Sequence, residues 1–403
     1  MTRTEDRLAD ALGASARTVR EDLLRPPVLP PHRDRRWARW LAPAAAAAAV
    51  ALVAVLVAAL TGQAPAHSPS ATGTPGPPRY YAVVGLKGQP QVRSTATGAV
   101  TATVPVHVVP NGGDGTITAS ANGTFFLAVA TSQSHQQIYQ FRLTATGQVS
   151  GFSAVPGGLF SDLAGAMAAS RDGSRLAVAT SDSAFSANKI VVIDVRTGAH
   201  SVWQGGLARR GFVGAEISSL SWTAGQQLVF AWQRCYPMAV NDQTCEAASH
   251  GGRRAAGVRE ISTASPGGRL DSGRVLLRQS ARYPYIASAL ISPDGQTITA
   301  LVMHGSLEHQ APGTVPRQLS VVQISAATGR QVRVLYQRPL GPTFYWTLSP
   351  DGPGTHWLLD GADSYGGGDG PRNLSKLGYN GWISGGKLIP LQPATGFIAG
   401  EAW

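Results

Sequence analysis

Charged side chains are scarce in this chain of 403 residues: Asp, Glu, Lys and Arg make up only 14%. Gly (47) and Pro (27) are plentiful instead. Few charges with many Gly and Pro are typical of short strands joined by turns, so we predict an all-β fold. The formal net charge is +11, yet no block of Lys and Arg is interleaved with aromatic residues. We therefore expect no nucleic-acid partner.

Several catalytic motifs are missing as well. The chain has no Gly-x-Ser-x-Gly elbow, which argues against a serine hydrolase of that type. It has neither a His-Glu-x-x-His run nor a Gly-Lys-Ser/Thr loop, the motifs of zinc proteases and of phosphate-cradling loops. These absences favour binding over chemistry, and we predict no obligatory cofactor.

The chain contains one long apolar run, residues 44–60, without a charged or hydrogen-bonding side chain. With its flanks it gives about 20 residues, enough for one membrane-spanning helix. Lys and Arg are absent after it until Arg79, whereas four arginines precede it: Arg33, Arg35, Arg36 and Arg39. The positive-inside rule places the N-terminus in the cytoplasm. A cleaved signal is the alternative, since Ala64-Pro65-Ala66 resembles a cleavage site.

This run divides the chain into four predicted parts. Residues 1–40 form a cytoplasmic tail, in which 2–24 fit a short amphipathic helix for docking or for resting on lipid. Residues 41–61 form the transmembrane helix of a single-pass cell-membrane protein. Residues 62–79 form a Pro-rich linker. Residues 80–403 form the extracytoplasmic domain, where Cys235 and Cys245 are predicted to pair as a local disulfide because the compartment is oxidising.

The extracytoplasmic part repeats a Ser-x-Asp/Asn-Gly turn between two apolar runs. Asp and Gly accept the backbone angles of tight hairpin turns. The copies begin at Ser120, Ser170, Ser292 and Ser349, with a degenerate copy at Trp222. A second turn follows in each unit, at Thr97-Gly98, Thr146-Gly147, Thr197-Gly198, Pro266-Gly267, Thr328-Gly329 and Gly385-Gly386.

Each unit therefore has four strands, A to D, and units of about 50 residues are typical of propeller blades. Five complete units begin near residues 116, 166, 218, 288 and 345. Residues 80–109 supply strands B, C and D without an A strand, while residues 396–403 supply a lone A strand. We predict a six-bladed β-propeller in which the N- and C-terminal strands share the last blade, so that no sheet edge stays open where the ring closes.

These turns resemble those of TolB-like, WD-repeat-like bacterial propellers over about 320 residues. Because 30 of the 34 basic residues are Arg and Ala is abundant, the composition also resembles that of an actinobacterial protein. The layout of tail, anchor and outer domain is similar to membrane-bound sigma-factor regulators, although the tail lacks the cysteines of their zinc motif. The fold resemblance says little about function.

The spacing between the two turns places the longest B-to-C connections near residues 233–256, 303–317 and 361–372. Loops on a rigid scaffold usually carry the binding residues. We therefore predict a binding face there for a protein partner or an anionic envelope ligand. The candidate residues are arginines for anions and tyrosines for stacking: Arg209, Arg210, Arg234, Tyr236, Tyr283, Tyr285 and Tyr345. The alternative is that these loops bind nothing and only cover the rim of the propeller.

A metal-dependent enzyme is the rival interpretation. Asp360, Asp363 and Asp369 lie in what we interpret as a Gly-rich loop, and three carboxylates suit calcium. Six-bladed propellers also include calcium-dependent lactonases, for which Asp162, Glu216 and Glu401 could approach the channel from the starts of A strands. An Asp- and Gly-rich loop is more often simply a turn.

Overall fold

The computed structural model describes residues 77–85, 89–106, 109, 115–132, 135–161, 163–181, 189–207, 214–235, 256–304, 318–339, 343–350, 356–363, 378–391 and 398–402. The chain divides into two compact units, Met1–Pro75 and Gly76–Trp403. The predicted tail helix, the membrane helix and nearly all of the linker lie outside the described residues. Within the described part, no helix is long and apolar enough to cross a membrane.

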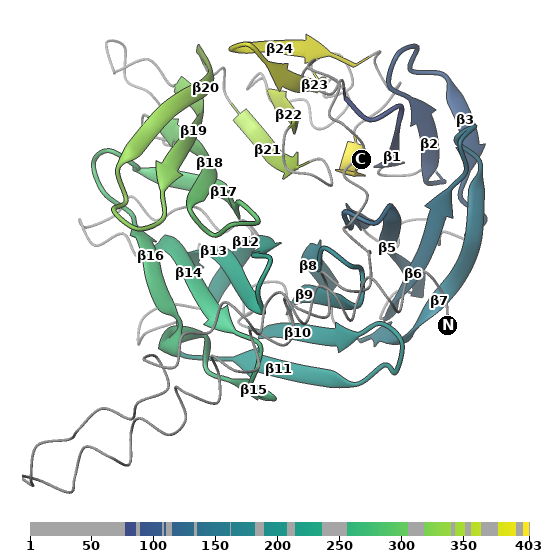
Figure 1. Ribbon diagram of the computed structural model, residues 1–403, viewed down its shortest axis with the longest axis horizontal. Coiled ribbons are helices and arrows are strands. Elements are labelled where there is room, and N and C mark those ends of the chain that lie inside the picture. The colour runs from purple at the N-terminus through teal and green to yellow at the C-terminus, as the bar shows by residue number, and fades with distance from the viewer. Residues whose placement is uncertain are drawn as a thin grey trace, which may run out of the picture. The chain divides into compact units, whose positions relative to one another are not determined.

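The second unit is a ring of six antiparallel sheets, each built on four strands (Figure 1). Blade 1 contains β25 (Ile398–Ala402), β1 (Tyr80–Gly85), β2 (Gln91–Ser94) and β3 (Val100–Thr103). Blade 2 contains β4 (Thr116–Ala119), β5 (Thr124–Ser132), β6 (His135–Leu143) and β7 (Val149–Phe160). Blade 3 contains β8 (Leu163–Ala169), β9 (Arg175–Ser181), β10 (Lys189–Asp194) and β11 (His200–Gln204).

The other three blades follow in chain order. Blade 4 contains β12 (Gly214–Trp222), β13 (Gln227–Cys235), β14 (Ala256–Ser262) and β16 (Arg274–Arg278). Blade 5 contains β17 (Tyr285–Ile291), β18 (Thr297–His304), β19 (Gln318–Ser325) and β20 (Gln331–Pro339). Blade 6 contains β21 (Thr343–Pro350), β22 (Trp357–Asp363), β23 (Gly378–Ser384) and β24 (Lys387–Pro390). The predicted six-bladed propeller is confirmed.

The ring closes where the two ends of this unit meet in blade 1. Strand β25 pairs antiparallel with β1, with Ala82 opposite Ala402 and Val84 opposite Gly400 (Figure 1). The first strands of successive blades contact one another all the way round, in the order β25, β4, β8, β12, β17, β21 and back to β25. Strand A is therefore the innermost strand of each blade, and the prediction of a blade shared by both termini is confirmed.

The Ser-x-Asp/Asn-Gly repeats of blades 2, 3 and 5 form A–B turns as predicted, whereas the second half of the copy that begins at Ser349 lies outside the described residues. In blade 3 the hydroxyl of Ser170 donates to Asp172 Oδ1 (2.7 Å), which also accepts the Ser174 amide (3.1 Å). The Gly173 amide closes the turn on the Ser170 carbonyl (2.8 Å), and Gly173 has φ +70°. Asn122 takes the place of the aspartate in blade 2 and makes the same contacts. The turns of blades 2, 3 and 5 thus hydrogen-bond internally and place glycine in the left-handed region, where other residues would be strained.

The C–D connection of blade 4 is not the tight turn that we predicted at Pro266-Gly267. Between β14 and β16 the chain forms β15 (Gly267–Gly268), which pairs in parallel with β11 of blade 3, and then the 3-10 turn η2 (Leu270–Ser272) (Figure 1). A Cβ atom on Gly267 would lie 2.4 Å from the Val202 carbonyl oxygen, so only glycine permits this approach. The Arg259 guanidinium donates to the carbonyls of Asp271 and Gly273, both at 2.8 Å.

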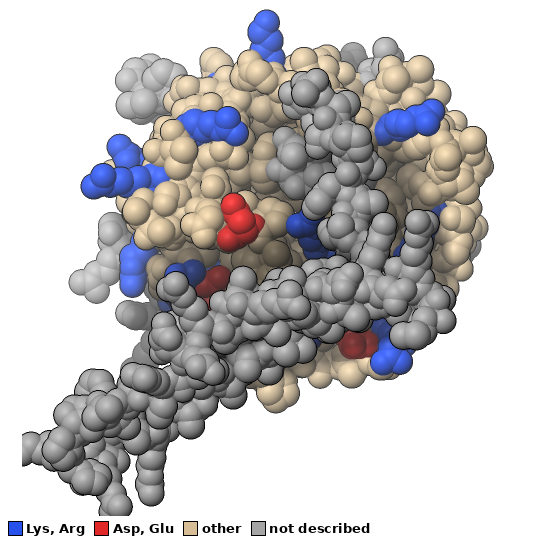
Figure 2. Space-filling view, viewed as in Figure 1, with Lys and Arg blue, Asp and Glu red and all other residues tan. Residues whose placement is uncertain are grey.

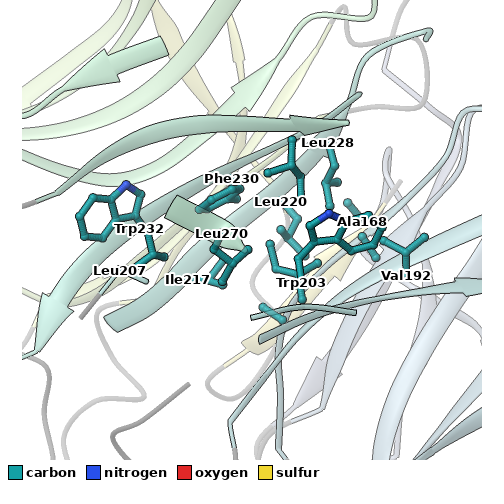
Figure 3. Close-up of a cluster of buried hydrophobic side chains, with 14 of the residues drawn as sticks. Ala168, Val192, Trp203, Leu207, Ile217, Leu220, Leu228, Phe230, Trp232 and Leu270 are labelled. Atoms are coloured by element: carbon teal, nitrogen blue, oxygen red, sulfur yellow. The ribbon is translucent and has the colours of Figure 1, made fainter. Parts of the chain in front are cut away.

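This excursion completes the apolar interface between blades 3 and 4. Leu270 is fully buried, and Figure 3 shows it beside Leu207 and Ile217. Trp203 packs in the same cluster, and Trp222 donates its indole N–H to the Ala168 carbonyl (2.9 Å) across the blade boundary. The extra residues of blade 4 therefore serve packing as well as the B-to-C loop to which we assigned them.

Removing β25 should open the ring. A chain without residues 397–403 leaves the inner edge of β1 unpaired, and we expect it to melt at a lower temperature, less cooperatively and with aggregation. Circular dichroism with light scattering measures both effects. A chain lacking only Trp403 is the control because β25 stays whole. Equal melting of the two truncated chains would contradict the closure argument.

Replacing Leu270 by Ala should destabilise the propeller. Because the site is fully buried between two blades, we expect the free energy of unfolding to fall by about 2–5 kcal/mol. Chemical denaturation measures the change. Leu159→Ala is the matched control, since Leu159 is 58% exposed and its loss should cost less than about 0.5 kcal/mol.

Candidate functional site

The innermost strands share an irregularity near their first residues. We call the side of the ring on which the A strands begin and the B strands end the mouth. Strands β8, β12, β17, β21 and β25 each contain one extra residue relative to their partner, near the end where the strand begins. Such β-bulges change which way the following side chains point and are frequent beside functional sites. These strand starts adjoin the B-to-C connections, as the pairing of Gly214 with Cys235 in blade 4 shows.

In β12 the bulge decides which neighbour Glu216 faces. Leu220 and Trp222 pack toward blade 3. In a regular strand every second side chain points to the same face, so Glu216 would face blade 3 as well. The extra residue falls between Ile217 and Ser219, however, and it reverses the alternation. Ile217 consequently packs toward blade 3, and Glu216 faces blade 5.

Two serine side chains fix β12 against β17. The Ser219 hydroxyl donates to the Ala289 carbonyl (3.0 Å) and accepts the Ala289 amide (2.9 Å). Ser221 Oγ accepts the Ile291 amide (2.9 Å). All of these groups are buried. Because buried polar groups are costly to leave unpaired, these bonds set the register of the two strands and hold their first residues together at the mouth.

Glu216, Gln233 and Tyr285 form a polar cluster at this end. Gln233 lies opposite Glu216 in the β12–β13 ladder, and its Nε2 donates to Glu216 Oε2 at 2.6 Å. Gln233 is only 6% exposed, and its Oε1 has no hydrogen-bond partner among the described residues. Glu216 and Tyr285 are half-buried. The cluster lies at the end of the sheet where β13 ends at Cys235 and β14 begins at Ala256, so the longest predicted loop, 233–256, is shorter than expected at both ends.

Burial perturbs both ionisable groups of this cluster. It raises the pKa of the Glu216 carboxyl, while the hydrogen bond from Gln233 partly offsets the rise. Burial, together with the charge of Glu216, raises the pKa of Tyr285 to about 12, again opposed by a hydrogen bond with Gln233. The phenol is thus neutral near pH 7. Two neighbouring groups with perturbed pKa values at the mouth indicate a functional site.

The predicted ligand residues fall into four groups. Arg209, Arg210 and Tyr236 lie outside the described residues. Arg234 and Tyr345 lie near the mouth ends of β13 and β21. Tyr285 joins the cluster above. Tyr283, in contrast, is 3% exposed and donates its hydroxyl to the Gly329 carbonyl (3.3 Å), a placement that favours packing between blades 4 and 5.

The loop that we predicted for the three aspartates begins later than expected. Asp360 and Asp363 lie within β22, and Asp360 is 6% exposed between Thr347 and Asn380 of the adjacent strands. Strand β22 continues through Asp360 because β21 and β23 pair with it on both sides. Asp369 lies outside the described residues, as does Cys245, the predicted partner of Cys235. No group of three His, Cys, Asp or Glu side chains in the described part of the chain is placed to hold a metal ion.

Gln233 escaped the sequence analysis, whereas Glu216 was considered only for the lactonase alternative. An uncharged glutamine at the end of the apolar run 228–232 carries no charge or motif that marks it. The one usable signal was its position, next to the predicted long connection.

The opposite, tight-turn side has its own polar features. A hollow of about 300 Å³ lies between the A–B turns of blades 2 and 3, lined by residues that include Arg142, Asp172 and Arg196. Both arginines are exposed. Figure 2 shows Lys and Arg at the left edge of the view, where β16 and β20 lie in Figure 1; in β16, Arg274 is paired with Glu260. These groups are solvated and lack the burial found at the mouth.

Asp360 should make stability depend on pH. Burial raises its pKa to about 7, so between about pH 4 and 7 the folded chain holds a proton that the unfolded chain releases. Stability should then fall as pH rises through this window, by about 1 kcal/mol per unit at most. Denaturation at pH 5 and pH 8 should show this loss in the wild type and much less of it in Asp360→Asn.

Asp294→Asn is the matched control for that experiment. Hydrogen bonds from Ser292 and Gln296 lower the pKa of this exposed turn carboxyl, so its contribution is lost only below about pH 4. Asn122 shows that asparagine fits the same turn position. An unchanged slope in Asp360→Asn would show that other groups cause the pH dependence.

No protein-family model and no curated protein sequence matches the chain. Solved structures similar to it include TolB from Acinetobacter baumannii, at 15% identity and a TM-score of 0.44 over 82% of this chain and 68% of that chain. A putative TolB from Agrobacterium tumefaciens is 14% identical, with a TM-score of 0.45 over 80% of this chain and 92% of that chain. An apocarotenoid oxygenase from Synechocystis is 9% identical, with a TM-score of 0.44 over 80% of this chain and 72% of that chain. Similarities this low concern the fold at most. The sheet topology of the chain itself carries the conclusion that it is a six-bladed β-propeller.

Proposed function

We propose that this protein is a membrane-anchored, non-catalytic binding or sensing module. Its propeller would engage a protein partner or another envelope ligand at the channel mouth on the side of the B-to-C connections. The observation that carries the proposal is the Glu216–Gln233–Tyr285 cluster, the place where buried polar groups with unused hydrogen-bonding capacity converge at the mouth.

A binding role suits the way this cluster is held. Side-chain bonds from β12 fix β17, and ladder pairing fixes β13, so the cluster is organised without any ligand. A preorganised site costs little conformational entropy when a ligand binds. Within the described residues the cluster offers one carboxyl group, and no second acid lies beside it to share acid–base work. Binding is therefore the simplest function of this geometry.

The membrane part of the proposal rests on the sequence. Residues 44–60 form an apolar run with arginines only on its N-terminal side, which favours a single span with the propeller outside. An exported domain on a Pro-rich linker is suited to meeting ligands in the cell envelope.

Site-specific photocrosslinking in membranes of cells that make the full chain tests this function. A benzophenone amino acid replaces Tyr285 at the mouth or, as the control, Gln226 in the exposed A–B turn of the neighbouring blade 4. We expect an adduct of discrete mass from position 285 and none from position 226. Adducts from position 226 alone, or from neither position, would contradict binding at the mouth.

A further inference from the structure

We infer that the group received by the Glu216–Gln233–Tyr285 cluster is a cation with N–H donors, namely the lysine or arginine side chain of a protein partner. This inference deepens the proposed function and rests on it. It does not follow from the predicted arginine-rich rim, which would instead attract anions.

The hydrogen-bond inventory requires a donor. The Gln233 amide nitrogen carries two hydrogens. One is directed to Glu216 Oε2, and the other is available to the Tyr285 oxygen. Its Oε1 is then an acceptor left unsatisfied, at a residue that is 6% exposed. Glu216 keeps further acceptor positions on its carboxylate. The neutral Tyr285 phenol supplies one O–H, which can satisfy only one of these acceptors. A ligand that only accepts hydrogen bonds would leave the others unpaired, at a cost of about 1–3 kcal/mol each.

The charges of the described residues favour a cationic donor. Among these residues, the effects acting on the Glu216 carboxyl are burial, which raises its pKa, and the Gln233 hydrogen bond, and no base of the described part acts on it. The two ion pairs between described residues, Arg269–Asp271 and Arg274–Glu260, involve other acids. A half-buried carboxylate without a counter-charge is destabilised by desolvation. An incoming ammonium or guanidinium ion supplies the missing charge and the missing donors together.

A side-chain cation fits better than a metal ion. Calcium takes six to eight oxygen ligands, whereas the cluster supplies one carboxylate, one amide oxygen and a neutral phenol. Lysine and arginine need only a few acceptors at hydrogen-bonding distance, and their apolar stems can lie along the mouth. Charge-assisted hydrogen bonds of this kind are about twice as strong as neutral ones.

Calorimetry with matched peptides tests the inference on the full chain in detergent. The probes are blocked Gly-Arg-Gly and Gly-Lys-Gly, and their neutral counterparts contain citrulline and acetyl-lysine. We expect the charged peptides to bind at least tenfold more tightly than the neutral ones. Binding should also release protons in mildly acidic buffer, because burial raises the pKa of Glu216 and a bound cation lowers it again. Buffers with different ionisation enthalpies reveal that release.

Two variants identify the carboxyl group. Glu216→Gln should abolish the preference for charged peptides and the proton release. Glu260→Gln, which changes an acid in the same blade that is already paired with Arg274, should leave both unchanged. Should Glu216→Gln fail to fold, the preference of the wild-type protein still decides.

Equal binding of charged and neutral peptides, no binding of any peptide, or a preference that survives Glu216→Gln would each overturn the inference. These outcomes are separable from failure of the proposed function. A crosslink from position 285 together with indifference to charge would leave the mouth as a binding face and remove only the cationic ligand.

Discussion

Packing on both sides of every blade is the constraint on which this fold depends. A sheet in the ring touches two neighbours, so its strands must offer an apolar surface to each. In β13, Leu228, Phe230 and Trp232 pack toward blade 3, while Val229 and Ala231 pack toward blade 5. This explains why the B strands are nearly continuous apolar runs instead of alternating ones. It also leaves few positions where a polar side chain is tolerated.

The ends of the inner strands are the positions released from that constraint. There the bulge in β12 turns Glu216 away from the apolar interface with blade 3. The same irregularity recurs in four other inner strands, which shows that the fold accommodates it repeatedly. The same buried contacts therefore explain both the rigid packing and the polar mouth. They hold the start of β12, the start of β17 and the end of β13 together, and these strand ends carry the cluster.

The repeated turns made the architecture predictable, whereas the cluster was not. Ser-x-Asp/Asn-Gly is a local pattern with local hydrogen bonds, so it revealed the blades and their shared closure. The bulges depend on register between strands, which no single stretch of sequence encodes. Asp360 looked like a loop residue because glycines follow it, yet pairing on both sides extends β22. Likewise the β15 excursion follows from a contact with blade 3, and the Pro266-Gly267 pair alone resembles an ordinary turn.

Closure by β25 also has a consequence for biosynthesis. Ala82 and its partner Ala402 are 320 residues apart in sequence, which makes this the most non-local pairing of the ring. At about 5–20 residues per second, translation separates the two strands by roughly 15–65 s. The other five blades are complete in chain order before then, while β1 waits with an unsatisfied inner edge. For that interval the nascent chain depends on protection of that edge, because open strand edges are where chains associate wrongly.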